Sequence, residues 1–441
     1  MSDARTSTAP PMPPAPRTLE ETGLNPDLVL QLVLKTLHLG GTLSGTELAR
    51  RLGVVFQVIQ PSLDQLKWQQ HCEIVAAGEA GAPTYKYRIS DAGRARAALF
   101  LEANHYLGKL PVPLDQYRRY MMEYRNVVAV KVTPEDVRRA FSHLVLSDRV
   151  LDQLGPAVCA GHSLFVYGPP GNGKTVISQA IGKLLAGEIA VPHAVEVEGG
   201  IVRVFDPVSH EPFPDTQSAA LTALDRGSPD DARWVRCRRP VVMVGGELTL
   251  DSLDLSYSES TGFYHAPVQM LANGGLLVID DFGRQRCEPR DLLNRWIVPL
   301  ESREDFLTLR TGMKFAVPFV VLVVFATNIK PAELVDEAFL RRIQYKVFAE
   351  NPTRQDFTRI FEDCCRQVQV PFDQSVVERL LQDQLHPRGI QLRGCQPRDL
   401  INQALAVAEY MGQPRLLTPA HLEAACDSYF VDDRTSPGVL A

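Results

Sequence analysis

The sequence predicts an α/β fold with a parallel-sheet core, accompanied along the chain by helical regions on both sides. Three short apolar runs predict buried strands, and each ends in glycine or polar residues: Leu164–Tyr167, Leu276–Ile279 and Val320–Phe325. Continuous apolar runs of this length are typical of parallel strands that are buried on both faces. A helical pattern follows the first run closely, and further helical patterns fill the chain after residue 351.

The first apolar run leads into a glycine-rich segment, and a helical pattern from Val176 to Leu184 comes next. The segment reads Gly168-Pro169-Pro170-Gly171-Asn172-Gly173-Lys174-Thr175. A strand, a glycine-rich turn and a helix in this order are typical of a phosphate-binding loop. Its backbone N–H groups and the start of the helix form an anion site, Lys174 can reach the β- and γ-phosphates, and Thr175 can bind Mg²⁺. We expect the whole segment and Val176 to bind the nucleotide.

Polar residues end the other two apolar runs. Asp280 and Asp281 end the second run, and Ala326-Thr327-Asn328 ends the third. A carboxylate at the tip of a strand beside the loop is where a Mg²⁺–nucleotide complex needs one. We assign Asp280 to Mg²⁺ and Asp281 to the base that polarises the attacking water. Asn328 is our candidate for orienting that water or sensing the γ-phosphate, with Thr327 as the neighbouring alternative.

The order of these motifs resembles that of the AAA+ ATPases over roughly residues 125–430, where Ala338-Phe339-Leu340-Arg341-Arg342-Ile343 follows the third strand. The resemblance implies an ATPase that uses ATP and Mg²⁺ and assembles as a homo-oligomeric ring, expected to be a hexamer. It also implies a chaperone-like role, in which the ring remodels a protein or nucleoprotein client. It implies that Arg342, or the adjacent Arg341, reaches into the neighbouring subunit's site and stabilises charge on the transferring phosphoryl group. The block Gln396–Leu400 resembles the family's second sensor, in which Arg398 contacts the γ-phosphate.

The chain departs from the family at Asp281, where the usual residue is Glu. Asp is one methylene shorter, which leaves open whether the protein is a fast ATPase or a slow nucleotide switch. The segment Phe263–Gly275 leads straight into the acid strand and resembles the helix-2-insert branch of the family, which includes MoxR-like ATPases.

A stretch that a nucleotide site does not need precedes that segment. Two alternating runs, Ala194–Val197 and Ile201–Val204, flank Glu198-Gly199-Gly200 and predict a hairpin. The hairpin and the polar stretch 206–240 exceed what a nucleotide site needs. Two interpretations stay open, a client-facing element and a surface insertion without a special role. Two roles also stay open for three aromatic residues, which either line a central pore of the ring or pack in the core: Tyr257, Phe263 and Tyr264.

Residues 27–108 follow a different pattern, in which three helices precede two strands joined by a glycine-rich turn. The order of helix, helix, turn, helix and hairpin resembles a winged helix. The third helix carries Gln57, Gln60, Asp64 and Lys67, and the wing carries Lys86 and Arg88. DNA recognition usually needs Arg or Lys at base edges and phosphates, and this block has little excess positive charge. Protein docking and DNA binding both remain open for it.

The composition describes an ordinary globular protein of two or three domains, with 441 residues, 45% hydrophobic residues and a net charge of −6. We expect no membrane insertion and no secretory signal, because apolar runs of the needed length are missing. The eight cysteines form no C-x-x-C pair, and reduced thiols in a cytoplasmic protein are the simplest interpretation.

We expect the following domains: a disordered Pro-rich arm at 1–26, the winged helix at 27–108, a linker at 109–135, the AAA+ core at 136–350, a helical lid at 351–432 and a tail at 433–441. Two other functions compete with the ATP-driven remodeller. One is a nucleotide-gated transcription regulator that binds DNA through the winged helix. The other is a scaffold that binds nucleotide without hydrolysing it, an alternative motivated by Asp281.

Overall fold

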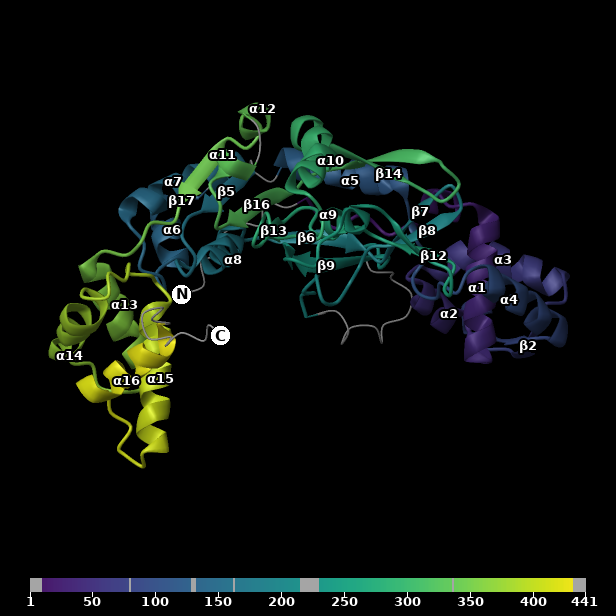
Figure 1. Ribbon diagram of the computed structural model, residues 1–441. Helices are drawn as coiled ribbons and strands as arrows, with labels where there is room; N and C mark the ends of the chain where they lie inside the picture. The colour runs from purple at the N-terminus through teal and green to yellow at the C-terminus, as the bar shows by residue number, and fades with distance from the viewer. Residues whose placement is uncertain are drawn as a thin grey trace, which may run out of the picture. The chain divides into compact units, whose positions relative to one another are not determined.

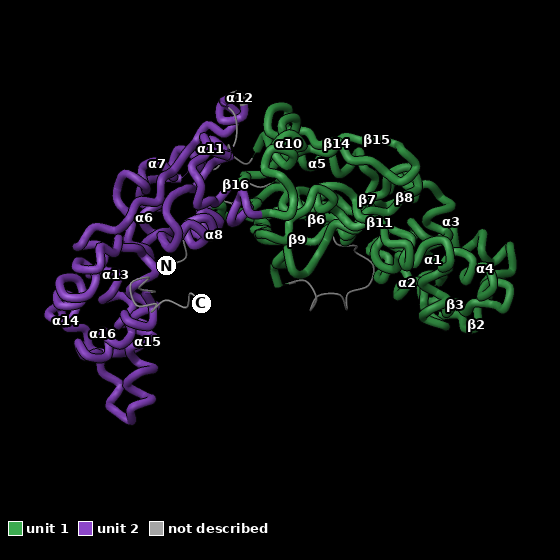
Figure 2. Tube along the Cα trace, in the orientation of Figure 1, with its two compact units in different colours: residues 1–130, 185–278, 285–323 green, residues 131–184, 279–284, 324–441 purple. Residues whose placement is uncertain are grey.

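The computed structural model describes residues 10–78, 81–127, 132–161, 163–214, 230–334 and 337–430. Two compact units are assembled from alternating stretches of the chain (Figure 2). Unit 1 comprises residues 1–130, 185–278 and 285–323, and unit 2 comprises residues 131–184, 279–284 and 324–441. This division differs from the domain order expected from the sequence, because Ala194, Ile201 and Phe263 share a hydrophobic core with N-terminal residues. The expected tail at 433–441 lies outside the described residues.

The N-terminal part of unit 1 combines four α-helices, α1 to α4, with a small antiparallel sheet of order β1-β3-β2. We call residues 26–103 the N-terminal block. Its second helix starts at a capping box, in which Ser44 accepts from the backbone of Glu47 and Glu47 accepts from the backbone of Ser44. Helices α1, α2 and α3 precede the antiparallel pair β2–β3, which is the order of helices and hairpin expected from the sequence. The elements are α1 (Pro26–Gly40), β1 (Thr42–Ser44), α2 (Gly45–Leu52), α3 (Phe56–Trp68), β2 (Cys72–Ala76), η2 (Ala82–Thr84), β3 (Lys86–Ile89) and α4 (Asp91–Ala103).

The remainder of unit 1 is mainly β-structure, with one five-stranded sheet of order β11-β12-β8-β7-β4 and two strand pairs, β6-β9 and β14-β15. The expected hairpin is confirmed, because β7 and β8 pair antiparallel with Val197 opposite Gly200. Phe263 and Tyr264 are buried in hydrophobic cores, which favours their core-packing interpretation. The elements are β4 (Val112–Pro113), α5 (Leu114–Val127), β6 (Glu188–Pro192), β7 (Ala194–Val197), β8 (Gly200–Arg203), β9 (Trp234–Arg238), β10 (Val241–Val244), η3 (Leu250–Leu253), β11 (Ser256–Ser258), β12 (Phe263–His265), α9 (Val268–Leu271), α10 (Pro289–Ser302), β14 (Glu304–Thr308) and β15 (Lys314–Pro318).

The structure differs from the expected disordered arm at residues 10–25. A short helix, η1 (Glu20–Thr22), forms there, and Leu19 and Leu24 are buried in the core that the N-terminal block shares. The buried guanidinium of Arg233 donates to the carbonyl of Thr22 at 3.3 Å and is paired with Asp231 at 2.8 Å. The segment is therefore held by the buried side chains of Leu19 and Leu24 and by the hydrogen bond from Arg233. Residues 1–9 of the arm lie outside the described part of the chain.

Unit 2 contains the parallel sheet that the sequence predicts. Strand β5 (Leu164–Tyr167) pairs in parallel with β16 (Leu322–Thr327) on one side and with β17 (Tyr345–Phe348) on the other. The carboxyl end of β13 (Leu276–Ile279) enters this unit at Ile279, and the chain beyond it bonds to β16 through Phe282 N and Ala326 O at 2.7 Å. The associated helices are α6 (Pro134–Ala140), α7 (Asp148–Ala160), α8 (Lys174–Leu184), α11 (Pro331–Leu334) and α12 (Glu337–Leu340).

The last part of unit 2 is helical, as expected after residue 351, and has a hydrophobic core of its own. Thr353 and Asp356 form a capping box at the start of α13, and Thr418 caps α16 just before Pro419. Helices α15 and α16 lie side by side (Figure 1). The elements are α13 (Arg354–Gln367), α14 (Gln374–Arg379), the π-helix η4 (Leu380–Leu385), α15 (Gln396–Tyr410) and α16 (Pro419–Tyr429). We call residues 353–430 the lid.

Two further observations concern the whole described chain. The eight cysteines form no disulfide bond. Within the described ranges, every helix is too short or too polar to pass through a bilayer.

Candidate nucleotide site

The phosphate-binding loop lies where the sequence predicts it, between the end of β5 and the start of α8. Gly171 and Gly173 have φ angles of 83° and 71°, in the left-handed region that glycine adopts at low cost. A Cβ atom on Gly171 would lie 2.6 Å from the Sγ atom of Cys395, whereas a Cβ on Gly173 meets nothing within 4 Å. The loop therefore needs glycine at 171 for space as well as for conformation, and at 173 for conformation alone.

The Lys174 side chain is folded into the loop. Its Nζ atom donates to the carbonyls of Gly168 at 3.0 Å and Pro169 at 2.8 Å. Burial lowers the pKa of the Lys174 ammonium, the carboxylates of Asp281 and Asp280 raise it, and the guanidinium of Arg393 lowers it further. The cation is thus held by loop carbonyls close to both carboxylates.

The two proposed Mg²⁺ ligands are already in contact, because the Thr175 hydroxyl donates to Oδ2 of Asp280 at 2.7 Å. The β5–α8 turn supplies one of these oxygens, and the residue just after β13 supplies the other. Mg²⁺ prefers oxygen ligands and commonly uses one or two protein groups together with substrate phosphates. Thr175 and Asp280 fit that requirement.

Asp281 has a left-handed backbone, with φ at 47°. Its backbone N–H donates to Oδ1 of Asp280 at 3.0 Å, and its Oδ1 atom accepts from Nδ2 of Asn328 at 3.0 Å. Asp is one of the few non-glycine residues enriched at positive φ. The local backbone therefore gives a physical reason for Asp at a position where the resembling family has Glu.

The two candidates at the end of β16 have different surroundings. The Thr327 side chain is buried, donates to the carbonyl of Phe282 at 2.7 Å and accepts from the backbone of Ile329 at 3.1 Å. These bonds fix the turn after β13. Asn328 is the residue whose side chain reaches Asp281.

The segment that begins the lid helix α15 is bonded to the loop. The backbone N–H of Cys395 donates to the carbonyl of Gly171 at 2.8 Å, and that of Gly394 donates to Oδ1 of Asn172 at 3.2 Å. The Nδ2 atom of Asn172 donates in turn to Oδ1 of Asn351 at 2.8 Å. The Asn172 side chain thus ties the loop to the lid and to the residues after β17.

Two arginines lie near the start of α15, and the structure places them differently. The Arg393 side chain lies against the loop, with Cβ and Cδ each 3.6 Å from the position of a Cβ on Gly171. Arg398, the residue chosen from the sequence, is exposed and forms an ion pair with Asp399 at 3.0 Å. The motif Gln396–Leu400 points to Arg398. No sequence signal points to Arg393, because the bend before α15 decides which side chain lies against the loop.

Arg341 and Arg342 follow α12 and precede β17. Because β17 and β5 are parallel, with Tyr345 opposite Leu164 and Phe348 opposite Tyr167, these arginines lie at the opposite end of the strands from the loop. Four residues of strand span roughly 13 Å. Arg341 forms an exposed ion pair with Glu337 at 3.0 Å.

A glycine-rich loop between a parallel strand and a helix, with acids from the next segment of sheet beside it, defines an α/β fold of the P-loop NTPase type. A family model described as a domain of unknown function, DUF8689, matches residues 353–428, which correspond to the lid. No curated protein matches the chain.

Several solved structures are similar to the chain in three dimensions. NtrX from Brucella abortus in complex with ATP has a TM-score of 0.40 and 15% identity, over 64% of this chain and 55% of that one. The chain therefore spans little more than half of that protein. NtrX from the same organism in complex with ADP has a TM-score of 0.40 and 14% identity, over 76% and 66%. The RuvB Holliday junction branch migration motor of Thermotoga maritima has a TM-score of 0.36 and 13% identity, over 68% and 71%.

Proposed function

We propose that this protein is a Mg²⁺-dependent ATPase of the AAA+ class. The observation that carries the proposal is the 2.7 Å contact between Thr175 of the phosphate-binding loop and Asp280 at the end of a neighbouring strand. A hydroxyl and a carboxylate so placed bind the ion that accompanies a nucleoside triphosphate. A loop with a purely structural role would not need the Thr175 hydroxyl and the Asp280 carboxylate next to Lys174.

Each residue then has a defined task. The loop backbone and Lys174 bind the β- and γ-phosphates, for which Lys174 exchanges its bonds to Gly168 and Pro169 for phosphate oxygens. Mg²⁺, held by Thr175 and Asp280, supplies positive charge against the phosphates. Asp281 accepts the proton of the attacking water, and Asn328 orients the Asp281 carboxylate.

The lid and the arginines complete the proposed site. Arg393 lies next to the loop and is our first choice for the lid residue that contacts the γ-phosphate, with Arg398 as the alternative. Arg342, or Arg341, lies at the far end of the strands from its own loop, which suits a residue that serves a neighbouring subunit. We therefore propose a homo-oligomeric ring, taken as a hexamer, in which ATP turnover remodels a bound protein client.

A complementation experiment tests the ring. Lys174→Ala should abolish tight nucleotide binding, and Arg342→Ala should bind ATP but not hydrolyse it. Mixed rings contain intact loops from the second variant facing intact arginines from the first, so the mixture should regain turnover that neither variant has alone. Normal turnover by Arg342→Ala alone contradicts the assignment in trans. The assignment is also contradicted if Lys174→Ala regains no turnover when it is mixed with Arg342→Ala and none when it is mixed with Arg341→Ala.

We propose that the N-terminal block is a winged helix that docks onto protein. Three basic residues that a DNA contact would use are paired with acids: Lys67 with Asp64, Arg88 with Glu73, and Arg94 with Asp91. Trp68, at the end of α3, is 84% exposed, and Ile74 and Val75 on β2 are also exposed. Exposed aromatic residues are typical anchors of protein interfaces.

The competing functions have their own signatures. A salt-dependent, sequence-selective shift of DNA by the purified protein would favour the transcription regulator. ATP turnover no faster than that of Asp281→Asn would favour the scaffold. Steady-state turnover of the wild type and of Asp281→Asn, measured together with the mass of the assembly, separates the scaffold from the motor.

A further inference from the structure

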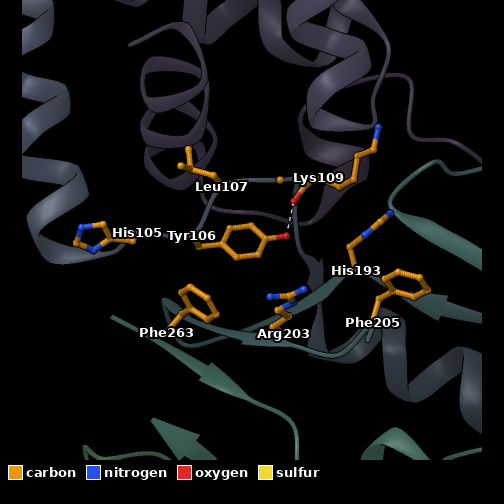
Figure 3. Close-up of a pocket in the computed structure, with 9 residues that line it drawn as sticks. His105, Tyr106, Leu107, Lys109, His193, Arg203, Phe205 and Phe263 are labelled. Atoms are coloured by element: carbon orange, nitrogen blue, oxygen red, sulfur yellow. Dashed lines mark hydrogen bonds between the residues drawn. The ribbon is translucent and has the colours of Figure 1, made fainter. Parts of the chain in front are cut away.

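A polar cavity lies within unit 1, whereas the phosphate-binding loop belongs to unit 2. It has a volume of about 240 Å³ and is formed where the residues after α4 meet strands β8 and β12 (Figure 3). Its wall includes Tyr106, Lys109, His193, Arg203, Phe205 and Phe263. Drug-sized ligands occupy cavities of about 300–1,000 Å³, so this one suits a smaller molecule.

The wall of the cavity is fixed by contacts of its own. The Tyr106 hydroxyl donates to the carbonyl of Lys109 at 2.8 Å, and the Tyr106 ring packs edge-on against Phe263 with centroids 5.8 Å apart. The backbone of His105 donates to the carbonyl of Thr261 at 2.7 Å. Tyr106 and Phe263 also belong to the core that the N-terminal block shares with the sheet. A ligand would therefore meet a preformed surface, which reduces the ordering that binding requires.

Arg203 gives the cavity its charge. In Figure 3 its guanidinium points into the space surrounded by the rings of Tyr106, Phe205 and Phe263, whereas the Lys109 side chain runs away from it. The Lys109 Nζ atom instead donates to the carbonyl of Arg50 at 2.6 Å. The nine residues of the wall include no Asp or Glu. Across the described part of the chain, no hydrogen bond or ion pair is observed for the Arg203 side chain.

The charge of Arg203 contributes to the pKa values of two nearby histidines, His193 and His265. Burial lowers the pKa of His193 to about 4, and the cations of Lys109 and Arg203 add to the effect. Burial also lowers the pKa of His265, which lies opposite Arg203 in the β12–β8 register. Arg203 adds to the lowering, and the carboxylate of Asp206 opposes it. At neutral pH His193 is therefore an uncharged hydrogen-bonding group beside a guanidinium.

We propose that this cavity binds a small organic oxyanion, a phosphate monoester or a carboxylate, that carries a flat apolar body. The planar guanidinium of Arg203 matches the paired oxygens of either group. The rings of Phe205, Phe263 and Tyr106 provide the apolar wall on which the body packs. The site is independent of ATP hydrolysis, and its ligand contacts both the segment after α4 and the sheet.

Calorimetric titration tests the proposal, with phenyl phosphate and benzoate as the probes. The full chain is used with Lys174→Ala, so that the phosphate-binding loop does not contribute. One equivalent of phenyl phosphate or benzoate should bind, and the tighter of the two identifies the oxyanion. Arg203→Gln should weaken that binding by at least about tenfold, and Phe205→Leu should weaken it while leaving the smaller inorganic phosphate unaffected.

A matched control separates the site from general charge. Arg238 is an exposed arginine of the same unit that is paired with Glu211, and Arg238→Gln should bind the probes as the parent does. Because Arg203 is exposed, its replacement should leave the thermal melting temperature unchanged. Equal affinity of Arg203→Gln and its parent overturns the proposal, as does the absence of binding for both probes, or equal binding of neutral benzyl alcohol.

Discussion

The Nδ2 atom of Asn328 donates to Oδ1 of Asp281 across 3.0 Å, and this bond joins the ends of two strands through residues that lie 47 positions apart in the chain. Asp281 keeps its carboxylate at the proposed site despite a left-handed backbone. The amide of Asn328 fixes the direction in which that carboxylate points. In the function that we propose, this pair positions the attacking water, so it governs hydrolysis rather than binding of ATP.

Replacing Asn328 with Ala should therefore reduce turnover more than binding. Without its partner the Asp281 carboxylate can rotate away from the water, and kcat should fall by roughly 10- to 100-fold. The Kd for ATP should change little, because the loop is untouched. Steady-state turnover and equilibrium binding of ATP check this prediction, and a variant with wild-type kcat would remove Asn328 from the site.

Replacing Asp281 with Glu should not improve the enzyme, although Glu is usual in the resembling family. The backbone at 281 has a φ of 47°, which a longer side chain without local hydrogen bonds tolerates less well, at a cost of about 1 kcal/mol. We expect a lower melting temperature and no gain in turnover. Faster hydrolysis by Asp281→Glu would show that chain length, not backbone conformation, governs this position.

Gly171→Ala and Gly173→Ala form a matched pair. Both positions have positive φ, but only an Ala at 171 meets an obstacle, the Sγ atom of Cys395 at 2.6 Å. Without nucleotide, Gly173→Ala should cost about 1 kcal/mol, and Gly171→Ala should cost more by about 1–3 kcal/mol. Thermal denaturation measures both, and Cys395→Ala should rescue part of the loss at 171 but none at 173.

Arg393→Ala should weaken ATP binding or turnover more than Arg398→Ala does. Arg393 lies against the loop and acts on the pKa of Lys174, whereas Arg398 is exposed and bonded to Asp399. Measuring kcat and the Kd for ATP for both variants distinguishes them. A larger loss of ATP binding or turnover in Arg398→Ala than in Arg393→Ala would favour Arg398 as the residue that contacts the γ-phosphate.

Lys35→Met should stabilise unit 1 at pH 7. The Lys35 side chain is 2% exposed, its Nζ atom donates to the carbonyl of Asn104 at 2.9 Å, and burial lowers its pKa to about 8. In the unfolded chain the pKa is near 10.5, so between pH 8 and 10.5 the unfolded state holds more protons. The cost of burying the charge is complete below pH 8 and disappears as the pH rises through this window.

At pH 7 the variant should gain roughly 1–3 kcal/mol, after allowance for the lost hydrogen bond. This advantage over the wild type should shrink from pH 8 to 10.5. Thermal denaturation of both proteins across this range checks the difference. A gain that is equal at pH 7 and pH 10 would mean that packing, not charge, is responsible.

The nucleotide site was predictable to the extent that it depends on local patterns. The strand, loop and helix around Gly168–Thr175 and the acids at 280 and 281 lie as the sequence predicts, because apolar runs and glycine spacing encode them locally. The contact of Arg393 with the loop was not predictable. It depends on the path of the chain before α15, where the backbone N–H of Cys395 donates to the carbonyl of Gly171.

The N-terminal segment shows the same limit. Residues 10–25 have a composition typical of disorder, yet Arg233 and a core assembled from distant residues hold them in place. A buried cation that lies more than two hundred positions away leaves no trace in the local composition. Residues 10–25 are therefore ordered by their contacts with distant residues and not by their own composition.

The pairing of β5 also sets an order of assembly during synthesis. Leu164 pairs with Val324 and with Tyr345, so the apolar strand before the phosphate-binding loop leaves the ribosome long before either neighbour exists. At about 5–20 residues per second, the wait for β17 is on the order of 10–40 s. Through this interval β5 is an unpaired apolar segment, and such segments are prone to aggregate. The proposed nucleotide site is therefore completed late in synthesis, after the interposed segments of unit 1 have been made.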